Sequence, residues 1–232
     1  NRSGRHDRAG QTAIGLQEVF ASATGVSKLY SETDCAIELG GEDAKILFFQ
    51  GSVEQRMNST CAGGTGAFID QMSTLLNMSL EEMNEASLNY HRLYPIASRC
   101  GVFAKTDIQP LINQGVDKCD LCASIFQAVV DQTITSLAQG RKIEGNILFL
   151  GGPLYFMSGL RKRFVETLKL SDVQVNCPET AINFVALGTA ICADQEYTYD
   201  ELYKALEDLV HAPAKLTESK PLFESEEDYQ KF

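Results

Sequence analysis

Hydrophobic residues follow two alternating patterns along the chain: short apolar runs, and longer stretches with helical spacing. The runs Cys35–Leu39 and 44–49, and residues 53–57 after the next turn, are separated by tight turns. This pattern predicts three strands in an antiparallel meander. Two later runs, 146–150 and 173–175, predict further strands. The first part of the sheet is therefore expected to form from neighbours in sequence.

Between and after these runs, apolar residues recur every three or four positions, as on one face of a helix. The longest stripe lies between Asp120 and Gly140, and Gly140 can end that helix. Its members are Leu121, Cys122, Ile125, Phe126, Val129, Val130, Ile134 and Leu137. Shorter stripes contain Phe68, Ile69, Met72, Leu75 and Leu76, then Leu160, Phe164 and Leu168, and finally residues 181–193. Ser79 and Glu82 predict a capping box at the start of another helix. The order of elements predicts an α/β fold in which helices pack on a mixed sheet.

Composition narrows the class of protein. The chain has 232 residues, of which 44% are hydrophobic and 22% charged, so it can bury a core and is not disordered. The net charge of -11 argues against a general attraction to nucleic acid. No uninterrupted run of 18 apolar residues occurs, so we expect no membrane-spanning helix.

The seven cysteines are an odd number in a chain too large to need disulfide staples. The first ten residues are basic and polar, and no apolar segment follows them as in a signal peptide. We therefore expect the reducing cytoplasm as the compartment. There, cysteines serve as buried apolar residues, catalytic groups or metal ligands.

Acidic residues outnumber basic ones most strongly after residue 193. Within this tail, residues 200–210 carry apolar side chains at helical spacing, namely Leu202, Tyr203, Leu206, Leu209 and Val210. Two prolines and an acidic run follow them. This composition predicts a helix and then an extended linker, with an acidic interaction tail as the alternative.

Two Gly–Gly pairs each follow a predicted buried strand: Gly40-Gly41, and Gly151-Gly152 with Pro153 after it. A backbone without Cβ atoms allows a phosphate or an adenosine to approach main-chain N–H groups closely. One such pair is more often a plain turn. Two pairs in one mixed sheet make a nucleotide site about as well supported as two plain turns. The chain contains neither a P-loop nor a G-x-G-x-x-G pattern, which disfavours those two nucleotide-binding classes.

Carboxylates flank the first glycine pair. Glu38 precedes it, and Glu42 and Asp43 follow it. Because Mg²⁺ prefers oxygen ligands and keeps several waters, these side chains could hold the ion directly or through water.

Cys61 and Cys100 each stand just before a segment that can start a helix. A thiolate at a helix start is stabilised by free N–H groups and by the positive end of the helix dipole. The glycines after Cys61 leave room for a bulky group. An iron–sulfur cluster normally needs four thiolates, so two per chain would suffice if a two-fold dimer supplied the others.

The other cysteines are interpreted as structural. Cys119 and Cys122 form a C-x-x-C, but Cys122 lies on the long apolar stripe and no second C-x-x-C completes a zinc site. Cys35, Cys177 and Cys192 stand in apolar surroundings, so we expect them in the core.

Three segments together resemble a known family. Residues 38–45 (ELGGEDAK), 57–68 (MNSTCAGGTGAF) and 98–105 (SRCGVFAK) are similar to the activator (component A) of 2-hydroxyacyl-CoA dehydratases, a group that includes the ATPase subunits of benzoyl-CoA reductase. The resemblance runs from about Gln17 to Ala193 and includes residues 149–153 (FLGGP). The two cysteine segments make it specific.

This resemblance implies a fold and a function. The family has the duplicated ribonuclease-H-like fold of the actin-like ATPases, a mixed sheet with helices on both faces. It is a homodimer with one bridging 4Fe-4S cluster, whose ligands here would be Cys61 and Cys100. ATP binding and hydrolysis drive a low-potential electron from the cluster to a dehydratase or reductase that acts on a CoA thioester. A ferredoxin or flavodoxin would be the electron donor.

The resemblance also assigns the nucleotide site. A phosphate loop would comprise Gly40, Gly41 and Glu42, and an adenosine loop Gly151, Gly152 and Pro153. Glu38 and Glu42 would be the catalytic residues, acting on ATP together with Mg²⁺. Glu38 stands where many members carry Asp, and the added methylene could shift a magnesium-bound water.

The chain departs from the family at its start, because nothing before Glu38 matches the Asp-x-Gly-Ser-Thr phosphate loop. We therefore expect the first lobe to be largely missing and the ATPase activity to be low. Residues 1–16 would be a remnant of that lobe or a flexible start, 17–195 the activator lobe, and 196–232 an acidic helix and linker. The tail resembles the linker of the long multidomain activases.

Two other functions remain open. A small-molecule kinase of the amino-sugar type belongs to the same superfamily, and in it the cysteines would be inert. The chain could instead be a docking lobe without catalytic function. Iron content distinguishes these two functions from the activator, because only the activator should contain iron after anaerobic purification.

Overall fold

The structure is a computed structural model that describes residues 4–6, 12–14, 17–58, 63–97, 101–193, 196–211 and 229–230. The chain divides into two units, Asn1–Cys192 and Ala193–Phe232. The first contains the sheet and the candidate site. The short strands β1 (Gly4–His6) and β2 (Thr12–Ile14) form a separate antiparallel pair.

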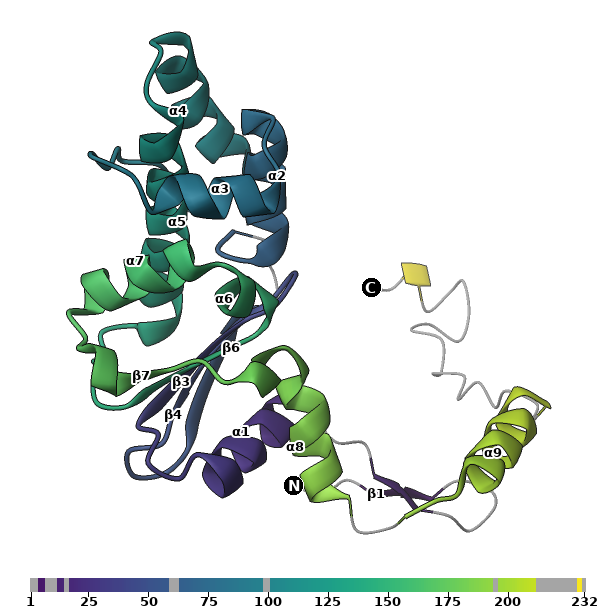
Figure 1. The fold of residues 1–232 in the computed structure, drawn as a ribbon. Coiled ribbons are helices and arrows are strands. Elements are labelled where there is room, and N and C mark those ends of the chain that lie inside the picture. Colours follow the sequence, from purple (N-terminus) through teal and green to yellow (C-terminus); the bar gives the residue numbers. More distant parts are fainter. Residues whose placement is uncertain are drawn as a thin grey trace. The chain divides into compact units, whose positions relative to one another are not determined.

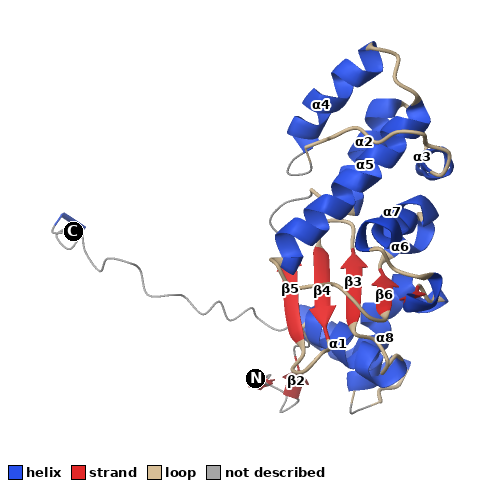
Figure 2. Ribbon diagram, turned by 90° about the vertical axis from the view of Figure 1, so that its left-hand side faces the viewer, coloured by secondary structure: helices blue, strands red, loops and turns tan. Residues whose placement is uncertain are grey.

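A five-stranded mixed sheet is the centre of the first unit (Figures 1 and 2), and its order is β5-β4-β3-β6-β7. The strands are β3 (Cys35–Leu39), β4 (Ala44–Phe48), β5 (Glu54–Asn58), β6 (Ile147–Leu150) and β7 (Val175–Asn176). β3, β4 and β5 pair antiparallel in sequence order, which confirms the predicted meander. β6 pairs parallel with β3, and β7 pairs parallel with β6.

Both faces of the sheet are covered by helices, so its central strands are buried along their whole length. Because side chains alternate along a strand, each strand contributes to two cores. Ile37 and Phe149 lie in the larger core, whereas Ala36 and Leu148 lie in the smaller one.

The larger core is closed by α2 (Gly66–Leu76), α3 (Leu80–Ser87), α4 (Gly101–Asn113), α5 (Lys118–Thr133) and α7 (Ser158–Leu168). The predicted stripes are confirmed, since Phe68, Phe126 and Phe164 are fully buried. The Ser79 capping box is present with both of its hydrogen bonds. A π-helical turn, Ile134–Ala138, extends α5 before Gly140.

The stretch Lys118–Ala138 is long and apolar enough to cross a membrane by length and composition alone. However, 67% of its apolar window is buried within the fold. That burial is typical of the core helix of a globular domain.

The smaller core lies under α1 (Glu18–Leu29) and α8 (Phe184–Cys192), which pack against each other. The sequence pattern did not predict α1, because its buried face consists of small residues: Ala21, Ser22, Gly25 and Val26. Gly188 allows the close approach. A Cβ atom there would lie 2.0 Å from the carbonyl oxygen of Ala21.

Two predicted elements are wrong in detail. Residues 173–175 were expected to form a strand, but Asp172–Gln174 is a 3₁₀ turn and β7 is only two residues long. The cause is a local capping box, in which the Gln174 side chain accepts from the Ser171 N–H. The helix expected over 181–193 begins instead as a 3₁₀ helix, Glu179–Asn183, and continues as α8.

The second unit contains α9 (Tyr199–His211), close to the predicted range. A reciprocal pair of hydrogen bonds between Thr198 and Glu201 fixes its start.

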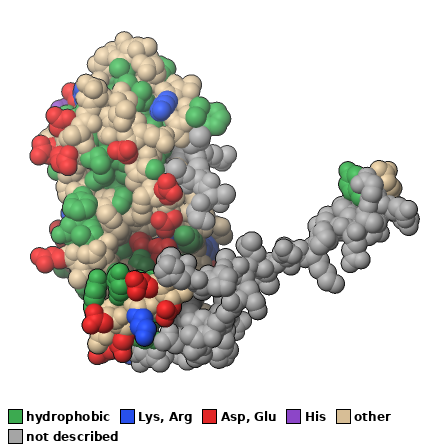
Figure 3. Space-filling model, turned by 90° about the vertical axis from the view of Figure 1, so that its right-hand side faces the viewer, with side chains coloured by type: hydrophobic (Ala, Val, Ile, Leu, Met, Phe, Trp, Pro, Cys, Tyr) green, Lys and Arg blue, Asp and Glu red, His purple; other side chains and the backbone are tan. Residues whose placement is uncertain are grey.

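Figure 3 shows acidic side chains outnumbering basic ones on the described part of one face, in line with the net charge.

We predict that Gly188→Ala destabilises the fold by about 1–3 kcal/mol, because the added methyl group meets backbone atoms that cannot move easily. Urea denaturation measures the change. Ala190→Ser, on an exposed position of the same helix, should change stability by less than about 0.5 kcal/mol. Equal stability of the Gly188 variant and the unmodified chain would contradict the close α1–α8 contact.

Candidate functional site

The two Gly–Gly turns lie side by side. Each follows the carboxyl end of one of two adjacent parallel strands, β3 and β6, and Glu38 is in register with Leu150. Ligands bind at such edges in open α/β sheets. Gly151 has φ +88, and a Cβ atom there would lie 2.0 Å from the carbonyl oxygen of Leu39. A side chain at Gly151 would therefore force the two strand ends apart.

Two of the four glycines face open space. A Cβ atom at Gly41 or Gly152 would meet no heavy atom within 4 Å. Gly40 differs, because its Cβ would lie 2.1 Å from Oδ1 of Asp43, and its N–H donates to the Asp43 carbonyl at 2.8 Å. Gly40 thus closes the turn, while Gly41 and Gly152 leave main chain accessible to a ligand.

The remaining predicted residues of the nucleotide site lie around these turns. Glu42 is exposed at the tip of the first turn. Pro153 lies in the first turn of the short helix α6 (Gly152–Phe156). Its carbonyl accepts from the Met157 N–H at 3.1 Å.

Glu38 is buried, with 6% of its surface exposed, and its carboxylate points toward α1. One carboxylate oxygen accepts from the Ser22 hydroxyl at 3.0 Å, and the other from Nζ of Lys45 at 2.9 Å. Lys45 is the cross-strand neighbour of Glu38 on β4. Both oxygens of this predicted catalytic residue are therefore already hydrogen-bonded.

Lys45 is only 1% exposed, and three carboxylates surround it. Its Nζ contacts Glu38, Glu18 of α1, and Oδ2 of Asp43 at 3.2 Å. Burial lowers the pKa of Lys45, but the Glu38 carboxylate and the hydrogen bonds to Glu18 and Glu38 outweigh it, so the pKa lies above its usual 10.5. Lys45 therefore remains protonated at neutral pH.

Sequence reasoning missed Lys45. The available signal was a lysine inside the apolar run AKILFF, which requires a buried counter-charge. The buried Oδ2 of Asp43 has its ion pair with Lys45 but makes no hydrogen bond within the described part of the chain.

The start of α2 is hydrogen-bonded to the first turn. The N–H groups of Gly66 and Ala67 donate to the carbonyls of Gly40 and Gly41, at 3.0 and 2.7 Å. These two amides are therefore not available to a thiolate, contrary to the expectation that the first N–H groups of this helix stabilise Cys61. Gly64 has φ +83, and a Cβ atom there would lie 3.1 Å from Cγ of Gln132, so this glycine has a local structural role.

Cys61 and Cys100 lie outside the described residues, but the segments that follow them are described. Residues 63–65 are buried, and Thr65 is the N-cap residue of α2. Gly101, where α4 begins, contacts α2, because its Cβ would lie 2.5 Å from Oε1 of Gln71. Among the described residues, no group of three or more His, Cys, Asp or Glu could hold a metal ion.

The structural interpretation of the other cysteines is confirmed for Cys35 and Cys122, which are buried. Burial raises the pKa of each of these two thiols to about 12. Cys119, Cys177 and Cys192 are partly exposed, so the core interpretation of the last two holds only in part.

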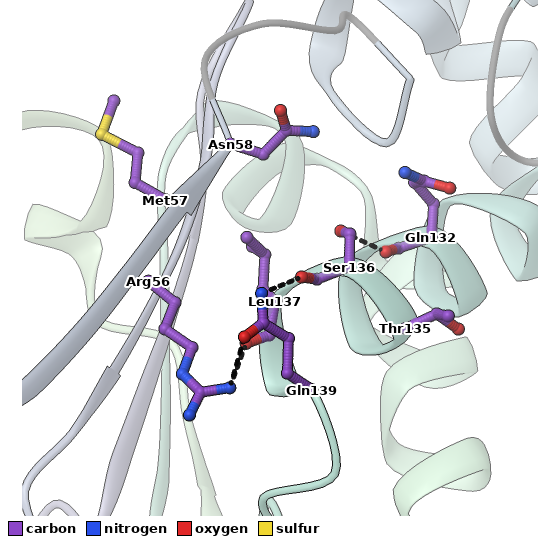
Figure 4. A pocket seen from close by; sticks show the side chains of 8 residues that line it. All are labelled: Arg56, Met57, Asn58, Gln132, Thr135, Ser136, Leu137 and Gln139. Atoms are coloured by element: carbon purple, nitrogen blue, oxygen red, sulfur yellow. Dashed lines mark hydrogen bonds between the residues drawn. The ribbon is translucent and has the colours of Figure 1, made fainter.

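A separate hollow of about 640 Å³ lies between β5 and the end of α5 (Figure 4). Arg56 lines it and donates to the carbonyl of Ala138 at 2.8 Å and to Oε1 of Gln139 at 3.3 Å. None of its lining residues belongs to the Gly–Gly turns. It is not part of the predicted nucleotide site.

We predict that Lys45→Met lowers the free energy of unfolding by about 3–5 kcal/mol, because Glu38 loses its buried counter-charge. Adding Glu38→Gln should recover much of this loss in urea denaturation. Lys28→Met, at an exposed position of α1, is the control. Because the folded pKa of Lys45 is raised, its stabilising effect persists below pH 10.5 and declines as the pH rises through the folded value. Additive effects of Lys45→Met and Glu38→Gln would contradict the pairing.

We predict slow alkylation of Cys35 and Cys122 by iodoacetamide at pH 8.5, since with a pKa of about 12 fewer than about one in 10³ of these thiols is ionised. Peptide mass spectrometry reads the labelling site by site. Cys192, which is partly exposed, serves as the comparison and should react first. Labelling of Cys35 at the rate found in denaturant would contradict its burial.

Similarity to known proteins agrees with this architecture. The profile of the BadF/BadG/BcrA/BcrD ATPase family matches residues 2–193. The (R)-2-hydroxyglutaryl-CoA dehydratase activating ATPase of Acidaminococcus fermentans is 28% identical over 192 residues, which cover 82% of this chain and 72% of that protein.

Two solved structures are also similar. Component A of the (R)-2-hydroxyglutaryl-CoA dehydratase of A. fermentans superposes with a TM-score of 0.69 at 27% identity, covering 77% of this chain and 68% of that one. The activator of the 2-hydroxyisocaproyl-CoA dehydratase from Clostridium difficile, with bound ADPNP, gives 0.68 at 25% identity, covering 86% and 72%. The predicted lobe of an actin-like ATPase is thereby confirmed. The chain belongs to the BadF/BadG/BcrA/BcrD ATPase family.

Proposed function

We propose that the chain is part of an ATP-dependent activator that passes a low-potential electron to a 2-hydroxyacyl-CoA dehydratase or reductase. One observation carries the proposal. The two Gly–Gly turns meet at the carboxyl ends of adjacent parallel strands, and the helix that follows Cys61 is hydrogen-bonded directly to the first turn. A nucleotide site and a redox site would thus share one structural element.

In this proposal, ATP or ADP binds through the main chain of the two turns. Gly41 and Gly152 leave the space that a phosphate or an adenosine needs. The exposed Glu42 is suited to hold Mg²⁺ through water. Glu38 would act on the magnesium-bound water only after one of its two present hydrogen bonds is exchanged.

Cys61 and Cys100 would supply two thiolates, and a second copy of the chain the other two, to a single 4Fe-4S cluster. Such a cluster supplies one-electron transfer at low potential. The chain's own contribution is to hold the two ligand segments, for which the contact of Gly101 with α2 is the supporting observation. Their thiolate charge would have to be stabilised by groups other than the Gly66 and Ala67 amides.

The proposed partners follow from the same interpretation. The chain would form a homodimer, accept an electron from a ferredoxin or flavodoxin in the cytoplasm, and dock on a dehydratase or reductase component. The relatives named as dehydratase activators support the class of partner. No nucleic acid or membrane is involved in the proposed reaction.

We predict that the chain, reconstituted anaerobically with iron and sulfide, is brown and holds about four iron atoms per two chains. Cys61→Ser and Cys100→Ser should each abolish iron retention, measured as iron and acid-labile sulfide per chain. Cys119→Ser is the matched control and should retain the cluster, because Cys119 belongs to the C-x-x-C interpreted as structural.

Two outcomes would contradict the proposal. A colourless unmodified chain would favour the small-molecule kinase or the docking lobe. Loss of iron in Cys119→Ser with retention in Cys61→Ser would move the metal site to the C-x-x-C.

A further inference from the structure

We propose that Gly66 is a positioning residue that couples the nucleotide site to α2. Its lack of a side chain lets α2 begin in contact with both Gly–Gly turns, so that a ligand bound there changes the stability of the first turn of α2. This inference rests on the proposed nucleotide site and adds a residue to it.

Three contacts define the junction at Gly66. A Cβ atom at this position would lie 3.2 Å from the Gly40 carbonyl oxygen, 3.3 Å from Cα of Gly41 and 3.2 Å from Cγ of Pro153. The first two belong to the turn after β3, and the third follows the turn after β6. Both turns and the helix therefore meet at one residue.

The requirement for glycine is one of space and not of backbone conformation. Gly66 is not among the described glycines with positive φ. Alanine would fit its helical backbone and loses less conformational entropy than glycine when the helix forms. If Gly66 had no role beyond starting the helix, alanine would be neutral or stabilising. If a methyl group at this position crowds the two turns, alanine should instead weaken nucleotide binding.

Direct hydrogen bonds connect the same parts. The Gly40 and Gly41 carbonyls accept the N–H groups of Gly66 and Ala67. When a ligand orders this turn, these two bonds open less often, and their amides should exchange more slowly with solvent. The core contacts of Phe68, Ile69 and Met72 make α2 a rigid element.

The effect extends to α4 through a described contact. Gly101, the first residue of α4, lies against Gln71 on the second turn of α2. The start of α4 is therefore packed directly on α2. The path consists of the turn, the first amides of α2, and the α2–α4 contact.

The first experiment measures amide hydrogen exchange of the unmodified chain with and without Mg-ADPNP. We expect exchange in the first turn of α2 to slow by about fivefold or more, the lower range of typical coupling between sites. Exchange at residues 165–168, the end of α7 farther along the chain from the second turn, should not change.

The second experiment compares Gly66→Ala with Asp70→Ala, whose side chain is on an exposed position of α2. Gly66→Ala should remain folded, weaken Mg-ADPNP binding by about tenfold and remove the slowing of exchange in α2. Asp70→Ala should retain both the affinity and the exchange response. The exchange response is the readout that a merely structural role of Gly66 would not alter.

The outcomes separate this inference from the proposed function. If the unmodified chain does not bind Mg-ADPNP, the proposed nucleotide site and this inference are both wrong. If it binds but α2 exchange is unchanged, or if Gly66→Ala responds like the unmodified chain, only the inference is overturned. If Gly66→Ala does not fold, the first experiment decides: slower α2 exchange in the unmodified chain with Mg-ADPNP supports the inference, and unchanged exchange overturns it.

Discussion

The parallel pairing of β3 with β6 is the constraint on which the candidate site depends. It joins a strand near the start of the domain to one more than a hundred residues later, and it aligns their carboxyl ends. Only then do the two Gly–Gly turns become neighbours. Gly151 keeps this alignment tight, because any side chain there would collide with the main chain of Leu39. A local change at this point would therefore separate two segments that are distant in sequence.

The buried charges beneath the first turn set its conformation. A buried ion pair is costly to form and strongly destabilising to break, so it is a device for fixing geometry more than a source of stability. Lys45 links Glu38 and Asp43 on either side of the turn with Glu18 of α1. The turn is consequently fixed by two sets of contacts: the ion pairs of Lys45 with Glu38 and Asp43, and the hydrogen bonds from the start of α2. Gly41 leaves its main chain accessible to a ligand, and these contacts still keep the turn in one conformation.

Much of the fold could be predicted because its signals are local. The meander, the Ser79 capping box and the long stripe of α5 each follow from residues close in sequence. The helix α1 escaped because small residues such as Gly25 give no hydrophobic stripe. Lys45 could have been noticed from its place inside an apolar run, but its partner Glu18 lies on α1, the helix that the pattern did not predict. The packing role of Gly66 depends on three segments meeting in space, which no local pattern encodes, and Cys61 and Cys100 lie outside the described residues.

The two edges of the sheet constrain how copies of the chain could associate. β7 is too short to template another strand, and β5 carries Glu54 and Arg56, which are paired with each other. Charged and very short edge strands discourage edge-to-edge pairing between molecules. A second copy would therefore have to meet this one through helices or loops and not by continuing the sheet. Self-association of this kind leaves the backbone ladder intact, and it can be reversible without any strand exchange.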